Sequence, residues 1–202
     1  MDLNIWLAFC AAAIVMLLIP GPTILLVIGQ SLGGGTRTAL PLVAGVALGD
    51  LTAMTLSLAG LGAILATSAT LFTALKWVGA AYLVWLGVKL WRAPVEPGAA
   101  PPLAGGRALR QAWLVTALNP KGIVFFVAFV PQFIDPARPF ALQAVVLVAT
   151  FVTLAAANAA IYAALAGRLS GAVRRPAVRR ALNRVGGGVL VGAGLAVALR
   201  RG

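Results

Sequence analysis

The sequence predicts an all-α integral membrane protein whose six transmembrane helices form two inverted three-helix repeats. Composition is the first observation behind this prediction: 61% of the 202 residues are hydrophobic, 10% are charged, and the mean hydropathy is +1.01. A soluble domain carries about 25% charged residues. The second observation is a pair of proline motifs that interrupt the first and fourth apolar segments at matching positions.

A spanning helix needs about 20 apolar residues. The predicted helices cover residues 3–32, 39–66, 71–91, 109–133, 140–165 and 185–199. No basic region precedes the first segment, so we expect it to be a permanent helix and not a signal peptide. The last segment is short, and both a full span and a re-entrant segment remain open for it. We expect one transmembrane domain, with repeat 1 at residues 1–91, a Pro/Gly-rich cytoplasmic loop at 92–108 and repeat 2 at 109–202.

The two proline motifs are Pro20-Gly21-Pro22 in the first segment and Asn119-Pro120-Lys121-Gly122 in the fourth. Proline removes a backbone donor and clashes with the preceding turn, so each motif should break its helix. At membrane depth, a broken helix is tolerated only where it lines a cavity or packs within protein. A simple kink is the alternative at either motif alone. Matched breaks in two halves favour a transport site.

A shift of the sequence by about 100 residues aligns Pro20 with Pro120 and the second helix with the fifth. Each half then holds three helices. Because three is odd, the second half must enter the membrane in the opposite orientation, which gives an inverted repeat. With the N-terminus outside, eleven of the sixteen Lys and Arg residues fall on the inner side and four on the outer side. This asymmetry favours an outside N-terminus and a cytoplasmic 92–108 loop.

Two charged residues fall at membrane depth, one in each half: Asp50 and Lys121. An acid at the bilayer centre costs about 2.5–3.5 kcal/mol on insertion scales, so we expect Asp50 to face the interior and to handle substrate or protons. A purely structural role is the alternative for Asp50, and snorkelling to an interface is the alternative for Lys121. Their similar depth also allows a charge pair across the two halves.

The helix that restarts after each break presents free N–H groups, which suit a carboxylate. Asp50 and the carbonyls freed by the breaks suit an ammonium. The amides Gln30, Asn119 and Asn158 are further candidates at depth or are interhelical contacts. The motif Gly45-x-x-x-Gly49 is interpreted as a packing surface.

Several function classes are excluded by residues that the sequence lacks. It has no histidine and one cysteine, so serine–histidine, zinc-protease and dithiol sites cannot form. We therefore expect no enzyme activity, no cofactor and no bound metal. The net charge of +12 follows the positive-inside pattern, which points to membrane lipid and not to nucleic acid. A metal-ion exporter and a channel remain the alternatives to a small-molecule carrier.

Together, Pro-Gly-Pro, Gly-x-x-x-Gly-Asp and Asn-Pro-Lys-Gly resemble the LysE/RhtB family of amino-acid exporters, as do the stretches 71–91 and 125–133. The resemblance covers nearly the whole chain. It implies a multi-pass secondary exporter of amino acids or close derivatives in the bacterial inner membrane, driven by protons through alternating access. The site residues it implies are Pro20, Gly21, Pro22, Asp50, Asn119, Pro120, Lys121 and Gly122.

Overall fold

The computed structural model describes residues 1–34, 36–67, 103 and 105–173, together with separate residues between 74 and 92 and between 177 and 195. The elements are α1 (Leu3–Leu18), α2 (Pro22–Gly34), α3 (Thr36–Thr67), α5 (Gly105–Ala117), α6 (Pro120–Val124), the π-helix η1 (Phe125–Phe129), the 3-10 helix η2 (Val130–Phe133) and α7 (Phe140–Val173). No strand occurs in these ranges. About half of the predicted segment 71–91 and most of the predicted segment 185–199 lie outside the described residues.

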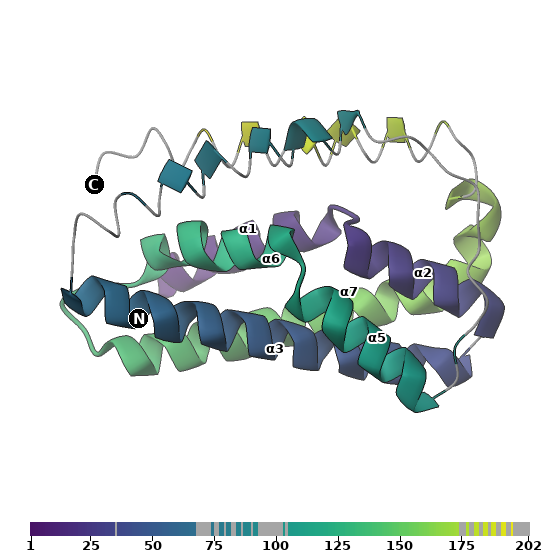
Figure 1. Cartoon of the computed structure of the whole chain (residues 1–202), viewed down its shortest axis with the longest axis horizontal. Coiled ribbons are helices and arrows are strands. Elements are labelled where there is room, and N and C mark those ends of the chain that lie inside the picture. The colour runs from purple at the N-terminus through teal and green to yellow at the C-terminus, as the bar shows by residue number, and fades with distance from the viewer. Residues whose placement is uncertain are drawn as a thin grey trace.

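Two helices are long and apolar enough to cross a membrane, over Thr38–Gly60 and Phe140–Ala166. Two bent pairs bring this number to four if each pair is one span: Leu3–Leu18 with Pro22–Ser31, bent by 57°, and Gly105–Ala117 with Pro120–Phe133, bent by 42°. The described part of the chain is thus all-helical, with two to four candidate membrane spans. Figure 1 shows both bent pairs and the two long helices lying along the length of the molecule, with the bends near its middle.

Both breaks have the same local cause. Ile19 and Asn119 each precede a proline, which disfavours the helical conformation in the preceding residue. Their backbone angles are nearly equal, at φ −75° and ψ 112° for Ile19 and φ −71° and ψ 111° for Asn119. Pro22 and Pro120 then begin the next helices, where a missing N–H costs nothing. The predicted breaks in the first and fourth segments are therefore confirmed.

Two predicted boundaries are wrong. α5 begins at Gly105, within the predicted loop 92–108, and α7 continues to Val173, beyond the predicted end at residue 165. In both cases the prediction followed apolar content, which marks the membrane span and not the helix end. The apolar part of α7 does end near the predicted position, at Ala166.

Each bent pair packs in parallel against the long helix of the other half. For α1 and α7, Trp6 Nε1 donates to Thr150 Oγ1 at 3.1 Å near one end, and the Tyr162 hydroxyl donates to the Leu18 carbonyl at 3.1 Å farther along. For α3 and α5, a Cβ added at Gly45 would collide with Leu109 and Ala112, and one at Gly49 would lie 2.5 Å from Thr116 Cβ. The packing role expected for Gly45 and Gly49 is thereby confirmed.

Two close approaches join residues that are 100 apart in the chain. A Cβ added at Gly21 would lie 3.5 Å from Lys121 Cδ. A Cβ added at Gly87 would lie 2.6 Å from the Gly187 carbonyl oxygen, and one added at Gly187 would lie 2.5 Å from the Gly87 carbonyl oxygen. The second contact is reciprocal, as contacts across a two-fold axis are.

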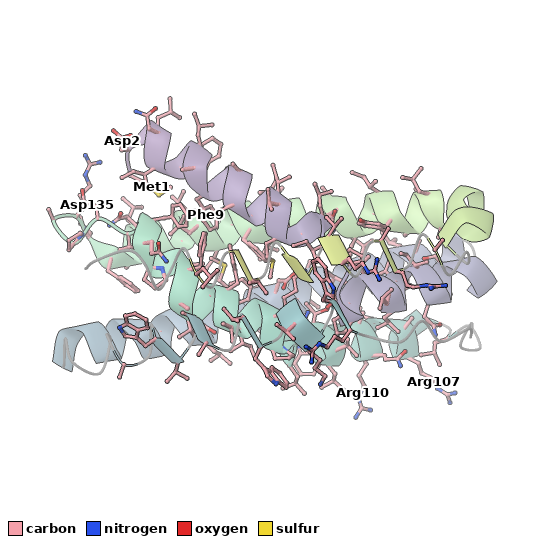
Figure 2. The ribbon with its side chains drawn as sticks, turned by 90° about the horizontal axis from the view of Figure 1, so that it is seen from above. Met1, Asp2, Phe9, Arg107, Arg110 and Asp135 are labelled. Carbon is pink, nitrogen blue, oxygen red and sulfur yellow. The ribbon has the colours of Figure 1, made fainter. Side chains whose placement is uncertain are left out.

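The buried apolar residues form two main clusters. The aromatic cluster joins α1, α3, η1, η2 and α7, and its larger members are Phe9, Met54, Phe125, Phe126, Phe133, Leu147 and Phe151. The small-residue cluster joins α2, α3, α5 and α7 and contains Val27, Leu42, Val46, Ala108, Ala112, Ala159 and Ala163. Figure 2 shows Phe9 in the half of the molecule that carries Met1, Asp2 and Asp135, whereas Arg107 and Arg110 lie at the opposite end.

Candidate functional site

A cavity lies where the two helix breaks meet, bordering both apolar clusters. Its lining comprises Met16, Leu17, Gly21, Thr23, Ile24, Val46, Asp50, Asn119, Lys121, Gly122, Phe151, Ala155 and Asn158. The space open to the centre of a water molecule is about 30 Å³. One buried water needs about 10–15 Å³ by this measure. The cavity therefore has room for about two waters and is too small for an amino acid in this conformation.

The C-terminal end of α1 supplies the carbonyl groups of the site. The last carbonyls of a helix have no intrahelical partner. Here Lys121 Nζ donates to the carbonyls of Met16 at 2.8 Å and Ile19 at 2.7 Å. The intervening carbonyls also accept hydrogen bonds, Leu17 from Asn158 Nδ2 at 3.2 Å and Leu18 from the Tyr162 hydroxyl. All three donor side chains belong to the second half of the chain, so the break in one half is completed by the other.

Lys121 lies in the first turn of α6 and is only 6% exposed, so its ammonium does not snorkel to an interface. An ammonium has three donors. Two of them reach the Met16 and Ile19 carbonyls, and within the described part of the chain the third has no acceptor. This leaves one N–H of a buried cation unused beside the cavity.

Asp50 lies in the middle of α3, is 7% exposed and lines the same cavity. Among the described residues, no donor hydrogen-bonds its carboxylate, and the only ion pair within 4.0 Å joins Arg138 to Asp135 at the surface. The predicted pair of Asp50 with Lys121 is therefore not formed in this conformation. The two opposite charges share the cavity without direct contact.

Asn119 connects the two breaks. Its Oδ1 accepts from the Lys121 backbone N–H at 3.1 Å and so caps α6, while its Nδ2 donates to Thr23 Oγ1 at 3.2 Å. The Thr116 hydroxyl also donates to Thr23 Oγ1, at 3.3 Å. Thr23 lies in the first turn of α2, so this buried network fixes the start of α2 against the α5–α6 break.

Of the predicted site residues, the structure brings Gly21, Asp50, Asn119, Lys121 and Gly122 together in the cavity lining. Pro20, Pro22 and Pro120 are not part of the lining and instead shape the breaks beside it. Of the other two amides, Asn158 lines the cavity, whereas Gln30 lies elsewhere and accepts from the Leu103 backbone N–H at 2.7 Å.

Sequence reasoning missed Thr23, Thr116 and Tyr162. Tyr162 follows Asn158 by four residues and so shares its face of α7, and this spacing was a usable signal. Thr23 and Thr116 carry no comparable signal, because isolated threonines are common in membrane helices and usually bond to their own backbone. Thr52 and Thr153 do so here.

A family model for the LysE type translocator matches residues 14–201. The chain belongs to the LysE type translocator family. Members of this family are translocators and not enzymes. The translocator is 40% identical to an uncharacterized membrane protein of Vibrio cholerae, over 98% of both chains.

Two relatives with a named substrate are also similar to this translocator. A homoserine/homoserine lactone efflux protein of Salmonella typhimurium is 36% identical over 96% of both chains. A leucine efflux protein of an Enterobacter species is 36% identical over 66% of this chain and 64% of its own. No solved structure matches the translocator. These two relatives are named as efflux proteins for amino acids or a derivative, as the family resemblance implied.

Proposed function

We propose that this LysE type translocator exports small zwitterionic amino acids or close derivatives across the bacterial inner membrane. The observation that carries the proposal is the cavity at the two breaks, where one buried carboxylate and one buried ammonium lie unpaired with each other. These charges complement those of a free amino acid. The efflux proteins for homoserine and leucine named among its relatives support the same substrate class.

Alternating access between the two halves is the mechanism that we propose. The halves have equivalent breaks at Ile19 and Asn119, the long helix of each half packs against the broken helix of the other, and Gly87 and Gly187 contact each other reciprocally. These features support an inverted repeat with a pseudo-two-fold axis through the breaks. A cavity with room for only about two waters would then belong to a state without bound substrate.

Export against a gradient needs an energy source, and we propose that protons supply it through Asp50. In the described residues, Asp50 is the only carboxylate at membrane depth, and it has no partner there that would hold it permanently ionised. Protonation would remove the negative charge that the cavity offers to an ammonium group. Taking up a proton from outside would therefore favour release on that side.

The cavity does not favour the metal-ion alternative. In the part of the chain that the structure describes, no group of three His, Cys, Asp or Glu side chains is placed to hold a metal ion. A lysine ammonium beside the one carboxylate would repel a metal cation. The channel alternative is tested by whether flux of the amino acid requires an imposed pH gradient.

The test is flux in proteoliposomes. Purified protein is reconstituted, and labelled homoserine, leucine and a panel of other amino acids are assayed with and without an imposed pH gradient. We expect saturable, gradient-dependent flux of at least one amino acid, Asp50→Asn to abolish it, and the surface carboxylate variant Asp135→Asn to retain it. Flux that ignores the gradient indicates a channel, and full activity of Asp50→Asn contradicts the proton proposal.

A further inference from the structure

The end of α1 holds a cation in a geometry made for a primary ammonium. The Met16 and Ile19 carbonyl oxygens lie 2.8 Å and 2.7 Å from Lys121 Nζ. These distances are typical of charge-assisted hydrogen bonds. The negative end of the α1 dipole adds to the attraction. The cation comes from the opposite half of the chain, at the residue aligned with Gly21 in the repeat.

We propose that these two carbonyls form a seat for a primary ammonium group, which Lys121 fills in the empty carrier and the α-ammonium of the substrate takes over during transport. The proposal rests on the proposed function for the identity of the substrate. The ε-ammonium of lysine and the α-ammonium of an amino acid are the same chemical group on a tetrahedral carbon. A seat that satisfies one satisfies the other.

The space in the cavity and the charges that line it favour an exchange over permanent occupation. Lys121 lines a cavity that is too small for an amino acid in this conformation, so we expect a bound substrate to displace it. Asp50 lines the same cavity and is not paired with Lys121, which makes it the acceptor for the displaced ammonium. Gly21 adjoins the lysine, since a Cβ there would lie in ordinary van der Waals contact with Nζ, at 3.7 Å.

The seat predicts a chemical rescue. Lys121→Ala removes three carbons and the ammonium, and these atoms correspond to n-propylammonium. We expect the melting temperature of Lys121→Ala in detergent to fall below that of the wild type and to rise again with propylammonium. Propyltrimethylammonium, which has the charge and no N–H donor, should have no effect. Lys89→Ala, which removes an exposed lysine, should show no propylammonium response.

Three outcomes of the rescue experiment overturn the seat. Lys121→Ala can ignore propylammonium, or it can respond equally to the trimethylated amine. Stabilisation by sodium chloride as strong as that by propylammonium would show a general cation site without preference for an ammonium.

A second measurement uses wild-type protein, so it does not depend on the folding of a variant. Binding of a labelled transported amino acid is competed with its unlabelled form and with its N,N,N-trimethyl derivative. We expect the trimethyl form to compete about tenfold less well or worse, because it leaves both carbonyls without a donor. Equal competition contradicts the seat. If amino acids are transported but the trimethyl form competes equally and propylammonium does not rescue Lys121→Ala, only the seat is rejected. If propylammonium rescues Lys121→Ala but no amino acid is transported, only the proposed function is rejected.

Discussion

Asn119 has two roles at one position, since its carbonyl oxygen caps α6 and its amide nitrogen holds Thr23 of α2. Serine at this position retains a capping oxygen but lacks the amide donor. The two substitutions Asn119→Ala and Asn119→Ser therefore separate the cap from the link between the two breaks.

We expect Asn119→Ala to lower the free energy of unfolding by about 1–2 kcal/mol, because it loses a helix cap and a partly buried hydrogen bond. Asn119→Ser should recover about 1 kcal/mol of this loss through the cap alone. Thermal unfolding in detergent measures both. Equal stability of the alanine and serine variants would show that the cap contributes nothing.

At the scale of elements, the contact of α3 with α5 depends on glycine. At Gly45 any side chain would collide with the Leu109 backbone and with Ala112, whereas at Gly60, on the same helix, a Cβ would meet nothing within 4 Å. These two positions allow a matched comparison in which helix propensity is the same and only packing differs.

We expect Gly45→Ala to destabilise the protein by about 1–3 kcal/mol, because α3 and α5 must move apart to admit the methyl group. Gly60→Ala should be neutral or stabilising by up to about 1 kcal/mol, as for a glycine in an open helix interior. Melting temperatures of the two variants, measured side by side, test the difference. A loss at Gly60 as large as that at Gly45 would assign the effect to the helix itself and not to packing.

The segment after α6 is the least regular part of the second broken helix. It passes from α-helix to the π-helix η1 and then to the 3-10 helix η2, which contains Pro131. π-Helical turns are rare and occur often at functional sites. Nothing in the sequence of residues 125–133 indicates this change of helical type, because the segment is apolar almost throughout.

At the scale of the whole molecule, the ends differ in charge. Figure 2 shows Asp2 and Asp135 at one end and Arg107 and Arg110 at the other. Ala137 is exposed and adjoins Asp135, because its backbone N–H donates to that carboxylate at 2.9 Å. The positive-inside bias predicts that the arginine end lies in the cytoplasm.

We expect a cysteine at Ala137→Cys to react with a membrane-impermeant maleimide in intact cells, and one at Arg107→Cys to react only after the membrane is opened. Both variants are made in a Cys10→Ser background, which removes the single native thiol. Labelling of Arg107→Cys in intact cells, with Ala137→Cys protected, would reverse the assigned orientation.

The two helix breaks and five of the cavity residues could be predicted from the sequence. A proline or a charged residue within an apolar segment is recognisable by itself, without knowledge of its neighbours in space. Lys121 and Asp50 were predicted at one depth and line one cavity, but their lack of contact was not predictable. It depends on the α1 carbonyls, which compete for the ammonium and belong to no particular side chain. The Thr23–Thr116 contact depends in the same way on how two bent helices meet.

The two apolar clusters on either side of the cavity are unequal in size, and this inequality gives the carrier a preferred resting direction. Separating the aromatic cluster would expose several phenylalanines to water, each with about 150–250 Å² of buried surface. Separating the small-residue cluster would expose mainly alanine and valine. Without substrate, the protein should therefore favour the conformation that is open towards the arginine end. If that end is cytoplasmic, as we expect, the resting carrier is ready to bind substrate from the cell. Inward leakage of substrate would then require the larger aromatic cluster to open.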